Sequence, residues 1–162
     1  MANPFSLQEL FSGLEGLTVR CVVSTADGCI VKADGQDSAT CPDCGVVSRS
    51  RHSRYRRQIR DLPLQGTRVM LDLMIGRWRC RAPKCQRRIF TERLASVVAR
   101  YARQTNRLTE TRTLVGRALG GRPGQHLLSR LGMPVSRHTL LRRVKEAAKS
   151  APPQGGSRNR RG

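Results

Sequence analysis

Residues 41–85 read CPDCGVVSRSRHSRYRRQIRDLPLQGTRVMLDLMIGRWRCRAPKC. A pair of closely spaced cysteines stands at each end of this stretch. Each pair can offer two sulfur atoms from adjacent backbone, which is how proteins usually build a tetrahedral zinc site with Zn–S distances of about 2.3 Å. Because the inner cysteines are 36 positions apart, the chain between them must leave and return, most simply as a hairpin. The stretch therefore predicts one structural Zn²⁺ at the base of a β-hairpin, held by Cys41, Cys44, Cys80 and Cys85.

Two other interpretations of these cysteines stay open. Cys41 and Cys44 could form a redox pair of the thioredoxin type, or all four cysteines could form disulfides in a secreted domain. A redox pair needs a strand before it and a helix that begins at it. Here Pro42 and Gly45 lie between a loop and an expected strand, and no secretory signal precedes them. Zinc is thus the favoured interpretation, and His52 is surplus to a site that already has four sulfur ligands.

The remaining cysteines, Cys21 and Cys29, do not resemble metal ligands. They lie in VRCVVSTADGCIVKA, where two short apolar strands flank the Asp-Gly dipeptide at residues 27–28, which suits a tight hairpin turn. A turn centred on this dipeptide would place Cys29 opposite Ala26 and Cys21 near Asp34. The two thiols would then not face each other, and we expect both as small buried apolar residues.

Charge is unevenly distributed along the 162-residue chain, which has 31 basic and 11 acidic residues and a formal net charge of +20. Residues 1–40 carry a net charge of −3, whereas residues 41–100 carry +11 and residues 101–150 carry +9. The basic part would repel itself unless a polyanion or counterions neutralised it. Nucleic acid is the expected partner. An anionic membrane surface is the weaker alternative, because no strongly amphipathic helix with large apolar residues accompanies the charge.

The segment between the cysteine pairs predicts two strands with an arginine-rich surface. The first strand runs from Val46 through RSRHSRYRRQIR and has polar side chains on both faces, and residues 62–66 break it. The second, RVMLDLMIGRWRC, has an apolar face. Arginine can bond phosphate with two parallel hydrogen bonds, and its stem can lie on an aromatic ring. These features predict DNA contacts by Arg49, Arg51, His52, Arg54, Tyr55, Arg56, Arg57, Arg77 and Arg79.

The second half of the chain has a helical pattern. We expect helices over residues 91–105, 106–121, 123–132 and 137–149, with Ser136 as the cap of the last one. The order of helix, glycine-ended turn and capped helix predicts a helix-turn-helix, although an ordinary αα-hairpin with a solvated face stays open. In such motifs the start of the second helix approaches base edges and later residues meet phosphates. The candidate contacts are Arg137, His138, Thr139, Arg142, Arg143 and Lys145.

Together these patterns predict an α+β fold in four parts. Residues 1–40 form a small helix, over residues 5–15, and a β-hairpin. Residues 41–92 form a zinc-clamped, zinc-ribbon-like β-hairpin with four cysteines as ligands. Residues 93–149 form an all-α helix-turn-helix domain, and residues 150–162 form a disordered basic tail.

Five motifs span about residues 5–147: GLEGLTV, CPDCG, HSRYRRQIRDLP, RWRCRAPKCQRRIFTERL and RPGQHLLSRLGMPVSRHTLLRRVK. In these motifs the sequence resembles the N-terminal region of the ISL-three family of bacterial insertion-sequence transposases. The resemblance implies a zinc finger followed by a helix-turn-helix, both binding the terminal inverted repeats of a mobile element. It also implies the same four zinc ligands, Cys41, Cys44, Cys80 and Cys85.

Members of this family continue into an RNase-H-like catalytic domain whose carboxylates hold two divalent metals. Here only APPQGGSRNRRG follows Lys149, and no aspartate follows Asp72. Glu110 and Glu146 alone cannot assemble a metal-dependent nuclease. We therefore expect a truncated or frame-interrupted transposase that keeps its DNA-binding half and is not an enzyme.

The expected function is zinc-dependent binding of double-stranded DNA in the bacterial cytoplasm, in association with the nucleoid. No apolar run approaches the ~18 residues that cross a bilayer, so no membrane partner is expected. Intact transposase, or a second copy bound through the N-terminal region, is a further candidate partner. Two alternatives stay open: a split transposase completed in trans by a catalytic domain, and an RNA-binding zinc protein. The helix-turn-helix argues against RNA, whose deep, narrow major groove does not admit a helix.

Overall fold

The structure, a computed structural model, describes residues 13–150 of the chain. The chain divides into two compact units, Met1–Glu110 and Thr111–Gly162. The first unit holds a β-sheet and the four cysteines of the predicted metal site, and helices follow. A mixed α+β fold is therefore confirmed.

Two predicted elements fall mostly outside the described residues. The predicted helix over residues 5–15 is described only at residues 13–15, which are not helical, and the predicted tail over residues 150–162 is described only at Ser150. Across residues 13–150, no helix is both long enough and apolar enough to cross a membrane.

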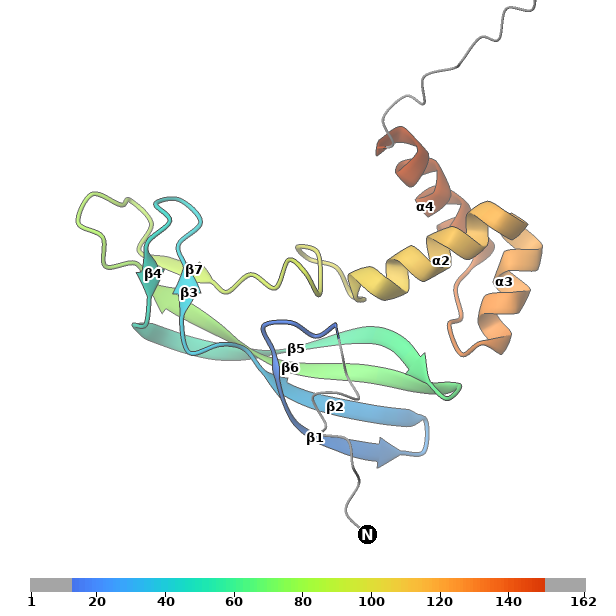
Figure 1. Cartoon of the computed structure of the whole chain (residues 1–162), viewed down its shortest axis with the longest axis horizontal. Coiled ribbons are helices and arrows are strands. Elements are labelled where there is room, and N and C mark those ends of the chain that lie inside the picture. Colours follow the sequence, from blue (N-terminus) through green and yellow to red (C-terminus); the bar gives the residue numbers. More distant parts are fainter. Residues whose placement is uncertain (1–12, 151–162) are drawn as a thin grey trace, which may run out of the picture. The chain divides into compact units, whose positions relative to one another are not determined.

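A five-stranded sheet forms the frame of the first unit (Figure 1). The strands described in this unit are β1 (Thr18–Thr25), β2 (Gly28–Asp34), β3 (Ala39–Thr40), β4 (Val47–Ser48), β5 (Arg51–Leu64), β6 (Thr67–Arg79) and β7 (Ile89–Thr91). The sheet has the order β1, β2, β6, β5, and β7 pairs with the C-terminal end of β6. β2 and β6 are parallel, whereas the other neighbours are antiparallel. β3 and β4 form a separate small sheet.

β5 and β6 form the long hairpin predicted between the cysteine pairs. Their connecting residues, Gln65 and Gly66, both have positive φ (49° and 76°), as in the type I′ turn that suits the twist of paired strands. The predicted break before this turn is wrong, because β5 continues to Leu64 and only its register shifts after Asp61. β5 lies at a sheet edge, where a proline such as Pro63 is tolerated. The apolar alternation of β6 is confirmed by buried side chains at Val69, Leu71, Leu73 and Ile75.

The first hairpin has a different register from the predicted one. Thr25 pairs with Gly28, so the turn consists of residues 26–27 and not of residues 27–28. Gly28 serves the contact between β2 and β6 instead: a Cβ added there would lie 2.3 Å from the backbone oxygen of Arg68. The glycine that the sequence assigns to the turn is therefore required by close packing of two strands.

Cys21 and Cys29 follow this changed register. Cys21 pairs with Lys32 and Cys29 with Ser24, so the predicted partners of both cysteines are wrong. Both thiols are free and half-buried, and burial raises the pKa of Cys29. They do not pair with each other, in agreement with the prediction that the two thiols would not face each other. The predicted burial of both residues is only partly met.

The segment after β7 is not the helix predicted over residues 91–105. Thr91 ends β7, and residues 92–105 follow an irregular path with short turns. The apolar side chains of this segment pack on one face of the sheet, which forms the main core together with residues before β1. Burial against the sheet thus overrides the helical pattern. The residues from outside the strands in this core are Leu14, Leu17, Leu94, Val97 and Val98.

Three helices follow: α2 (Asn106–Leu119), α3 (Gly121–Arg130) and α4 (Arg137–Ser150). α3 begins two residues before its predicted start, and Pro123 falls in its first turn, where the missing N–H costs no hydrogen bond. The predicted positions of the three helices are otherwise close to those observed.

α3 and α4 pack against each other in the second unit. The predicted cap of α4 is confirmed, because Ser136 Oγ accepts a hydrogen bond from the backbone N–H of Thr139 (3.3 Å). Leu128 and Leu140 are fully buried. A Cβ added at Gly124 would lie 3.0 Å from Leu140 Cδ2, so the absence of a side chain lets α4 approach α3 closely.

Candidate metal centre and basic surfaces

The four cysteine sulfurs lie together, all within 4.8 Å of one another. Cys41 Sγ is 3.9 Å from Cys85 Sγ, and Cys44 Sγ is 3.6 Å from Cys80 Sγ. Four sulfurs at about 2.3 Å from a central zinc would be about 3.8 Å apart at the corners of a tetrahedron. The donor set therefore fits one Zn²⁺, and each close pair joins one cysteine from each end of the stretch.

Backbone hydrogen bonds shape the two cysteine loops, which extend beside β3, β4 and β7 (Figure 1). In the first loop, the N–H of Gly45 donates to the Cys41 carbonyl, and the Cys41 N–H donates to Val46 (2.9 Å each). Gly45 has φ of 73°, which glycine adopts without strain. In the second loop, the Cys85 N–H donates to the Ala82 carbonyl (3.1 Å). These turns direct the two sulfurs of each loop toward the common four-sulfur site.

The thiols affect one another's ionisation. Burial raises the pKa of Cys41, but the backbone N–H groups of Asp43 and Cys44 and the neighbouring sulfurs lower it to about 7. The backbone N–H of Arg87 lowers the pKa of Cys85, but burial and the other three sulfurs raise it to about 12. The cluster thus accommodates a first thiolate and opposes further ones, because like charges would lie close together. A bound divalent cation would stabilise all four thiolates at once.

A small buried cluster supports the metal site. Trp78 is fully buried and Phe90 is 3 % exposed, and both pack with Cys41 and Cys80. In addition, Ser48 Oγ donates a hydrogen bond of 2.6 Å to the backbone carbonyl next to Cys80, that of Arg79. Cys80, directly after β6, and Cys41, in the loop before β4, are therefore held by packing that does not depend on the metal alone.

His52 lies outside the four-sulfur group. It is exposed on β5, and its Nδ1 lies 3.1 Å from Ser53 Oγ. The structure favours zinc over the two alternatives. No helix begins at Cys41 or Cys44, as a thioredoxin-type redox pair requires. The paired sulfurs are 3.9 and 3.6 Å apart, too far for a disulfide bond.

Two of the predicted DNA-contacting arginines lie over aromatic rings. The Arg51 guanidinium is 4.9 Å from the centroid of the Trp78 ring, and it also donates to Asp37 Oδ1 (2.7 Å). The Arg77 guanidinium is 5.2 Å from the centroid of the Tyr55 ring. These ring contacts favour one placement of each guanidinium by about 0.5–1 kcal/mol at an exposed site.

Two further arginines of β5 are engaged within the protein. Arg56 forms an ion pair with the buried carboxylate of Asp72, which raises the pKa of the arginine, and 62 % of the Arg56 side chain stays exposed. Arg57 donates to the backbone carbonyl of Ala102. These contacts use part of the hydrogen-bonding capacity that the sequence assigned to phosphate.

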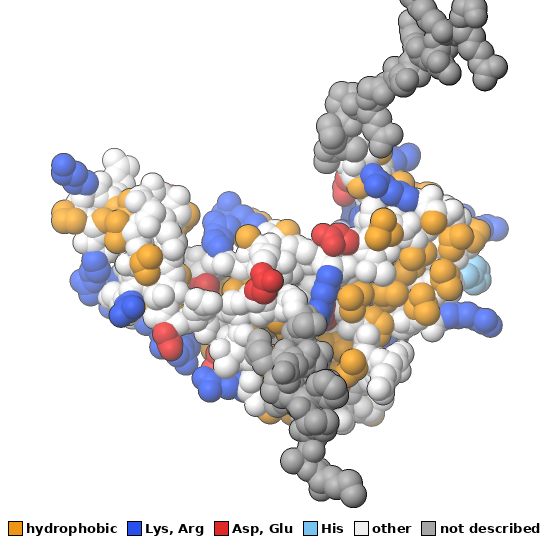
Figure 2. Space-filling model, in the orientation of Figure 1, with side chains coloured by type: hydrophobic (Ala, Val, Ile, Leu, Met, Phe, Trp, Pro, Cys, Tyr) orange, Lys and Arg blue, Asp and Glu red, His pale blue; other side chains and the backbone are white. Residues whose placement is uncertain are grey.

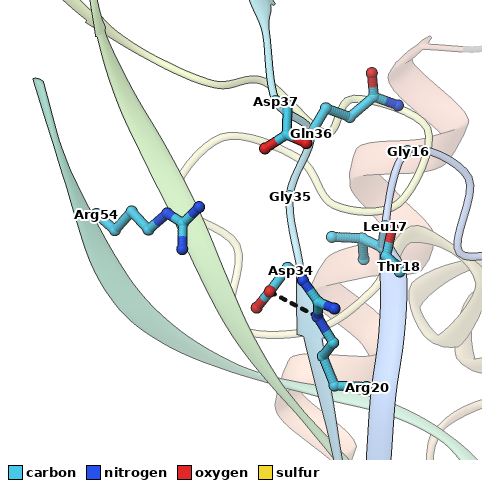
Figure 3. Close-up of a pocket in the computed structure, with 9 residues that line it drawn as sticks. All are labelled: Gly16, Leu17, Thr18, Arg20, Asp34, Gly35, Gln36, Asp37 and Arg54. Atoms are coloured by element: carbon cyan, nitrogen blue, oxygen red, sulfur yellow. Dashed lines mark hydrogen bonds and ion pairs between the residues drawn. The ribbon is translucent and has the colours of Figure 1, made fainter. Parts of the chain in front are cut away.

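Arg54 lines a hollow of about 330 Å³ in the first unit (Figure 3). Asp34 and Asp37 line the same hollow, and Asp34 Oδ2 accepts a hydrogen bond from Arg20 Nε (2.8 Å). Two carboxylates thus offset the two guanidiniums, and the hollow does not favour an anion. The other predicted contacts on the hairpin, Arg49 and Arg79, are exposed.

The helix α4 presents most of its predicted contacts to solvent. Its Leu140 is buried, whereas Val144 and Ala147 on the same face are half-buried. Arg142 is 3.8 Å from Glu146 in an exposed ion pair along the helix. Among the predicted contacts, Arg137, His138, Arg142 and Lys145 are exposed, and Thr139 and Arg143 are half-buried.

The helical unit also exposes leucines that are not among the predicted site residues. Figure 2 shows hydrophobic side chains gathered over these helices. An apolar surface thus accompanies the basic face of α4. The exposed leucines are Leu114, Leu119, Leu127, Leu131 and Leu141.

Sequence reasoning missed an arginine-rich groove in the first unit. This groove, which we call the arginine groove, has a volume of about 1000 Å³. It lies between β5, the end of β6, β7 and the segment that follows β7, residues 92–103. Four residues of its rim, Arg93, Arg100, Tyr101 and Arg103, come from the segment predicted to be helical. Aromatic and basic residues interleave in RYARQ, which is the signal that could have revealed it.

Residues 37–85 match the family model described as the zinc-finger of transposase IS204/IS1001/IS1096/IS1165. No curated protein and no solved structure matches the chain. The matched segment contains all four clustered cysteines and the β5–β6 hairpin. Sequence and sulfur geometry therefore agree that residues 37–85 form a zinc-ribbon domain similar to that of the ISL-three type of transposase, with a site for one structural Zn²⁺.

Proposed function

We propose that this protein is a zinc-dependent, double-stranded DNA-binding protein derived from a bacterial transposase. Its proposed target is the terminal inverted repeat of a mobile element, and the chain itself contributes no catalysis. The observation that carries the proposal is the match of residues 37–85 to a transposase zinc-finger. That zinc ribbon belongs to a region, residues 41–100, with a net charge of +11, which suits phosphate.

The second proposed contact is a helix-turn-helix formed by α3 and α4. The turn between them contains Gly132, which has φ of 75°, and Ser136 caps α4. In this arrangement Arg137, His138, Thr139 and Arg142 approach base edges in the major groove, and Arg143 and Lys145 meet phosphates. The exposure of the first turn of α4 supports this assignment.

The metal chemistry supports a structural role. Within residues 13–150, one group of three or more side chains could hold a metal ion, and it is the four-cysteine cluster. Four protein ligands complete a tetrahedral zinc site and leave no open position for a substrate. The zinc would therefore hold the base of the hairpin.

Binding of the zinc-loaded chain to labelled duplexes tests the proposal. We expect tighter binding to the end sequence of the element than to a scrambled duplex, and weaker binding to both after chelation of zinc. With 6 to 10 phosphate contacts, affinity should fall by about 10³ to 10⁵ between 50 and 200 mM salt. Equal affinity for both duplexes would mean that the chain binds DNA only as a non-specific polycation. A flat salt response would contradict phosphate binding.

A further inference from the structure

The arginine groove presents a cationic surface. The one acidic side chain in its lining, Glu92, is buried and accepts hydrogen bonds from the backbone N–H groups of Gln36 (2.8 Å) and Gly76 (3.2 Å). Its charge is therefore engaged by the backbone and turned away from solvent. Six arginines line the same groove: Arg57, Arg77, Arg87, Arg93, Arg100 and Arg103.

The groove also has an apolar floor. Tyr55 lines it half-buried, and the buried side chains of Ile75, Phe90, Leu94 and Val98 close it from beneath. Free phosphate or an acidic peptide would use the cations but leave the exposed ring of Tyr101, at the rim, without a stacking partner. A nucleotide chain supplies both phosphates for the arginines and flat bases that can stack on this ring.

Tyr101, at the rim of the groove, has an unusual combination of exposure and backbone conformation. It is 80 % exposed and has φ of 60°, and it lies in a turn closed by the Ala102 N–H, which donates to the Ala99 carbonyl (3.1 Å). The left-handed conformation is unfavourable for tyrosine, and the exposed ring gains little from packing that would offset this. The Arg100 guanidinium lies 4.6 Å from the ring centroid and covers one face. The ring is thus placed to receive a flat group.

We propose that the arginine groove binds an unpaired strand of DNA, with one base stacked on Tyr101 and phosphates on Arg93 and Arg103. A duplex keeps its bases paired and stacked inside, so its bases could not reach Tyr101, whereas a single strand exposes them. Arg93 and Arg103 are exposed, and within residues 13–150 their side chains have no hydrogen bond or ion pair. The choice of DNA over RNA rests on the proposed function. The groove shares Tyr55, Arg57 and Arg77 with the predicted duplex contacts, whereas Tyr101, Arg93 and Arg103 belong to the groove alone.

The stacking part is tested with the zinc-loaded full chain and a fluorescein-labelled thymidine oligonucleotide of about 12 nucleotides, within the span that one single-strand site covers. Tyr101→Gly removes the ring but keeps a residue that suits φ of 60°. We expect its melting temperature to equal or exceed that of the wild type, and its affinity for the oligonucleotide to fall about tenfold. Tyr101→Phe should bind like the wild type. Unchanged affinity of the folded Tyr101→Gly variant would overturn the proposal.

The phosphate part is tested with matched charge removals. The double variant Arg93→Gln, Arg103→Gln should weaken binding and lower the slope of log affinity against log salt by about 1.4, at about 0.7 per single-strand contact. Lys32→Gln, Arg68→Gln removes the same charge from exposed positions that do not line the groove, and it should have a much smaller effect. Equal losses in both double variants would overturn the site, as would tighter binding of a uridine oligoribonucleotide of the same length. Duplex affinity, measured in parallel, tests the proposed function separately, and we expect it to be unchanged in Tyr101→Gly.

Discussion

Cys44 is the cysteine that best isolates the contribution of the metal, because it is the exposed member of the four-sulfur site. Cys44→Ser removes one ligand and opens no cavity in the core. We expect the zinc content of the purified chain to fall well below one ion per molecule and the thermal midpoint to drop. The physical reason is that structural zinc contributes directly to folding, by about 10–16 kcal/mol in small zinc-binding peptides. Elemental analysis and thermal denaturation give the two measurements.

Cys21→Ser is the matched control for this substitution. Cys21 is a free, half-buried thiol on β1, outside the four-sulfur group. The control should keep its zinc and show only a small change in thermal midpoint. Wild-type zinc content in Cys44→Ser would contradict a site with four sulfur ligands.

Asp61 forms a buried link between β5 and the start of α2. Its side chain is 0 % exposed and accepts hydrogen bonds from Thr105 Oγ1 and Arg107 Nε, both at 2.8 Å. Asp61→Ala would leave a partly buried arginine without its carboxylate. Removing one partner of a buried ion pair costs about 3–5 kcal/mol, and we expect the lower end because 31 % of the Arg107 side chain is exposed. Urea denaturation measures the loss of unfolding free energy.

Asp37 provides the comparison for Asp61. It pairs with Arg51 at 2.7 Å, but 97 % of its side chain is exposed. Asp37→Ala should therefore cost less than about 1 kcal/mol, since solvent screens exposed ion pairs. If the two substitutions cost the same, burial would not be what makes the Asp61 contact strong.

Residue identity constrains a metal site more tightly than it constrains DNA contacts. Zinc requires particular ligands at particular spacings, so four cysteines were sufficient to name the site. An arginine has no such requirement, because it can pair with any nearby carboxylate, carbonyl or ring. Arg57 illustrates this: the sequence assigned it to DNA, and the structure shows it donating to Ala102.

At the scale of elements, Gly28 tests the close contact of β2 with β6. Gly28→Ala would place a methyl group 2.3 Å from the backbone oxygen of Arg68, and φ there is 151°. We expect a loss of more than about 2 kcal/mol in unfolding free energy, because a backbone clash adds to conformational strain. Gly66→Ala introduces conformational strain but no clash, since φ is 76° and nothing lies within 4 Å of the added group. It should cost about 1 kcal/mol, and an equal cost for both would contradict the close contact.

The elements that the sequence predicted correctly are those with local signals. Ser136 caps α4, and Gln65-Gly66 forms the turn of the long hairpin. Residues 91–105 have an equally helical composition but lie across the sheet face, where Leu94, Val97 and Val98 are buried. A pattern of apolar residues shows which side chains become buried, but it does not show whether a helix or an extended segment buries them.

At the scale of the whole molecule, the parallel pairing of β2 with β6 was not predictable from the sequence. It joins the first hairpin to the zinc-clamped hairpin across about forty residues, from Val31 to Leu71. No turn or capping signal marks such a contact. The N-terminal hairpin belongs to residues 1–40, which carry a net charge of −3 and which the sequence set apart from the basic region; it is nevertheless part of the same sheet.

The net charge of the molecule predicts opposite effects of salt on folding and on DNA binding. With 31 basic and 11 acidic residues, carboxylates can neutralise only a minority of the cations, and the remainder repel one another. Raising the ionic strength from 0.01 to 0.15 M shortens the Debye length from about 30 to about 8 Å and weakens that repulsion. We expect the thermal midpoint of the zinc-loaded, DNA-free chain to rise by a few degrees over this range, while its affinity for DNA falls. A lower midpoint at high salt would mean that ion pairs such as Arg107 with Asp61 outweigh the net repulsion. A rise would show that repulsion among the basic residues destabilises the folded, DNA-free protein.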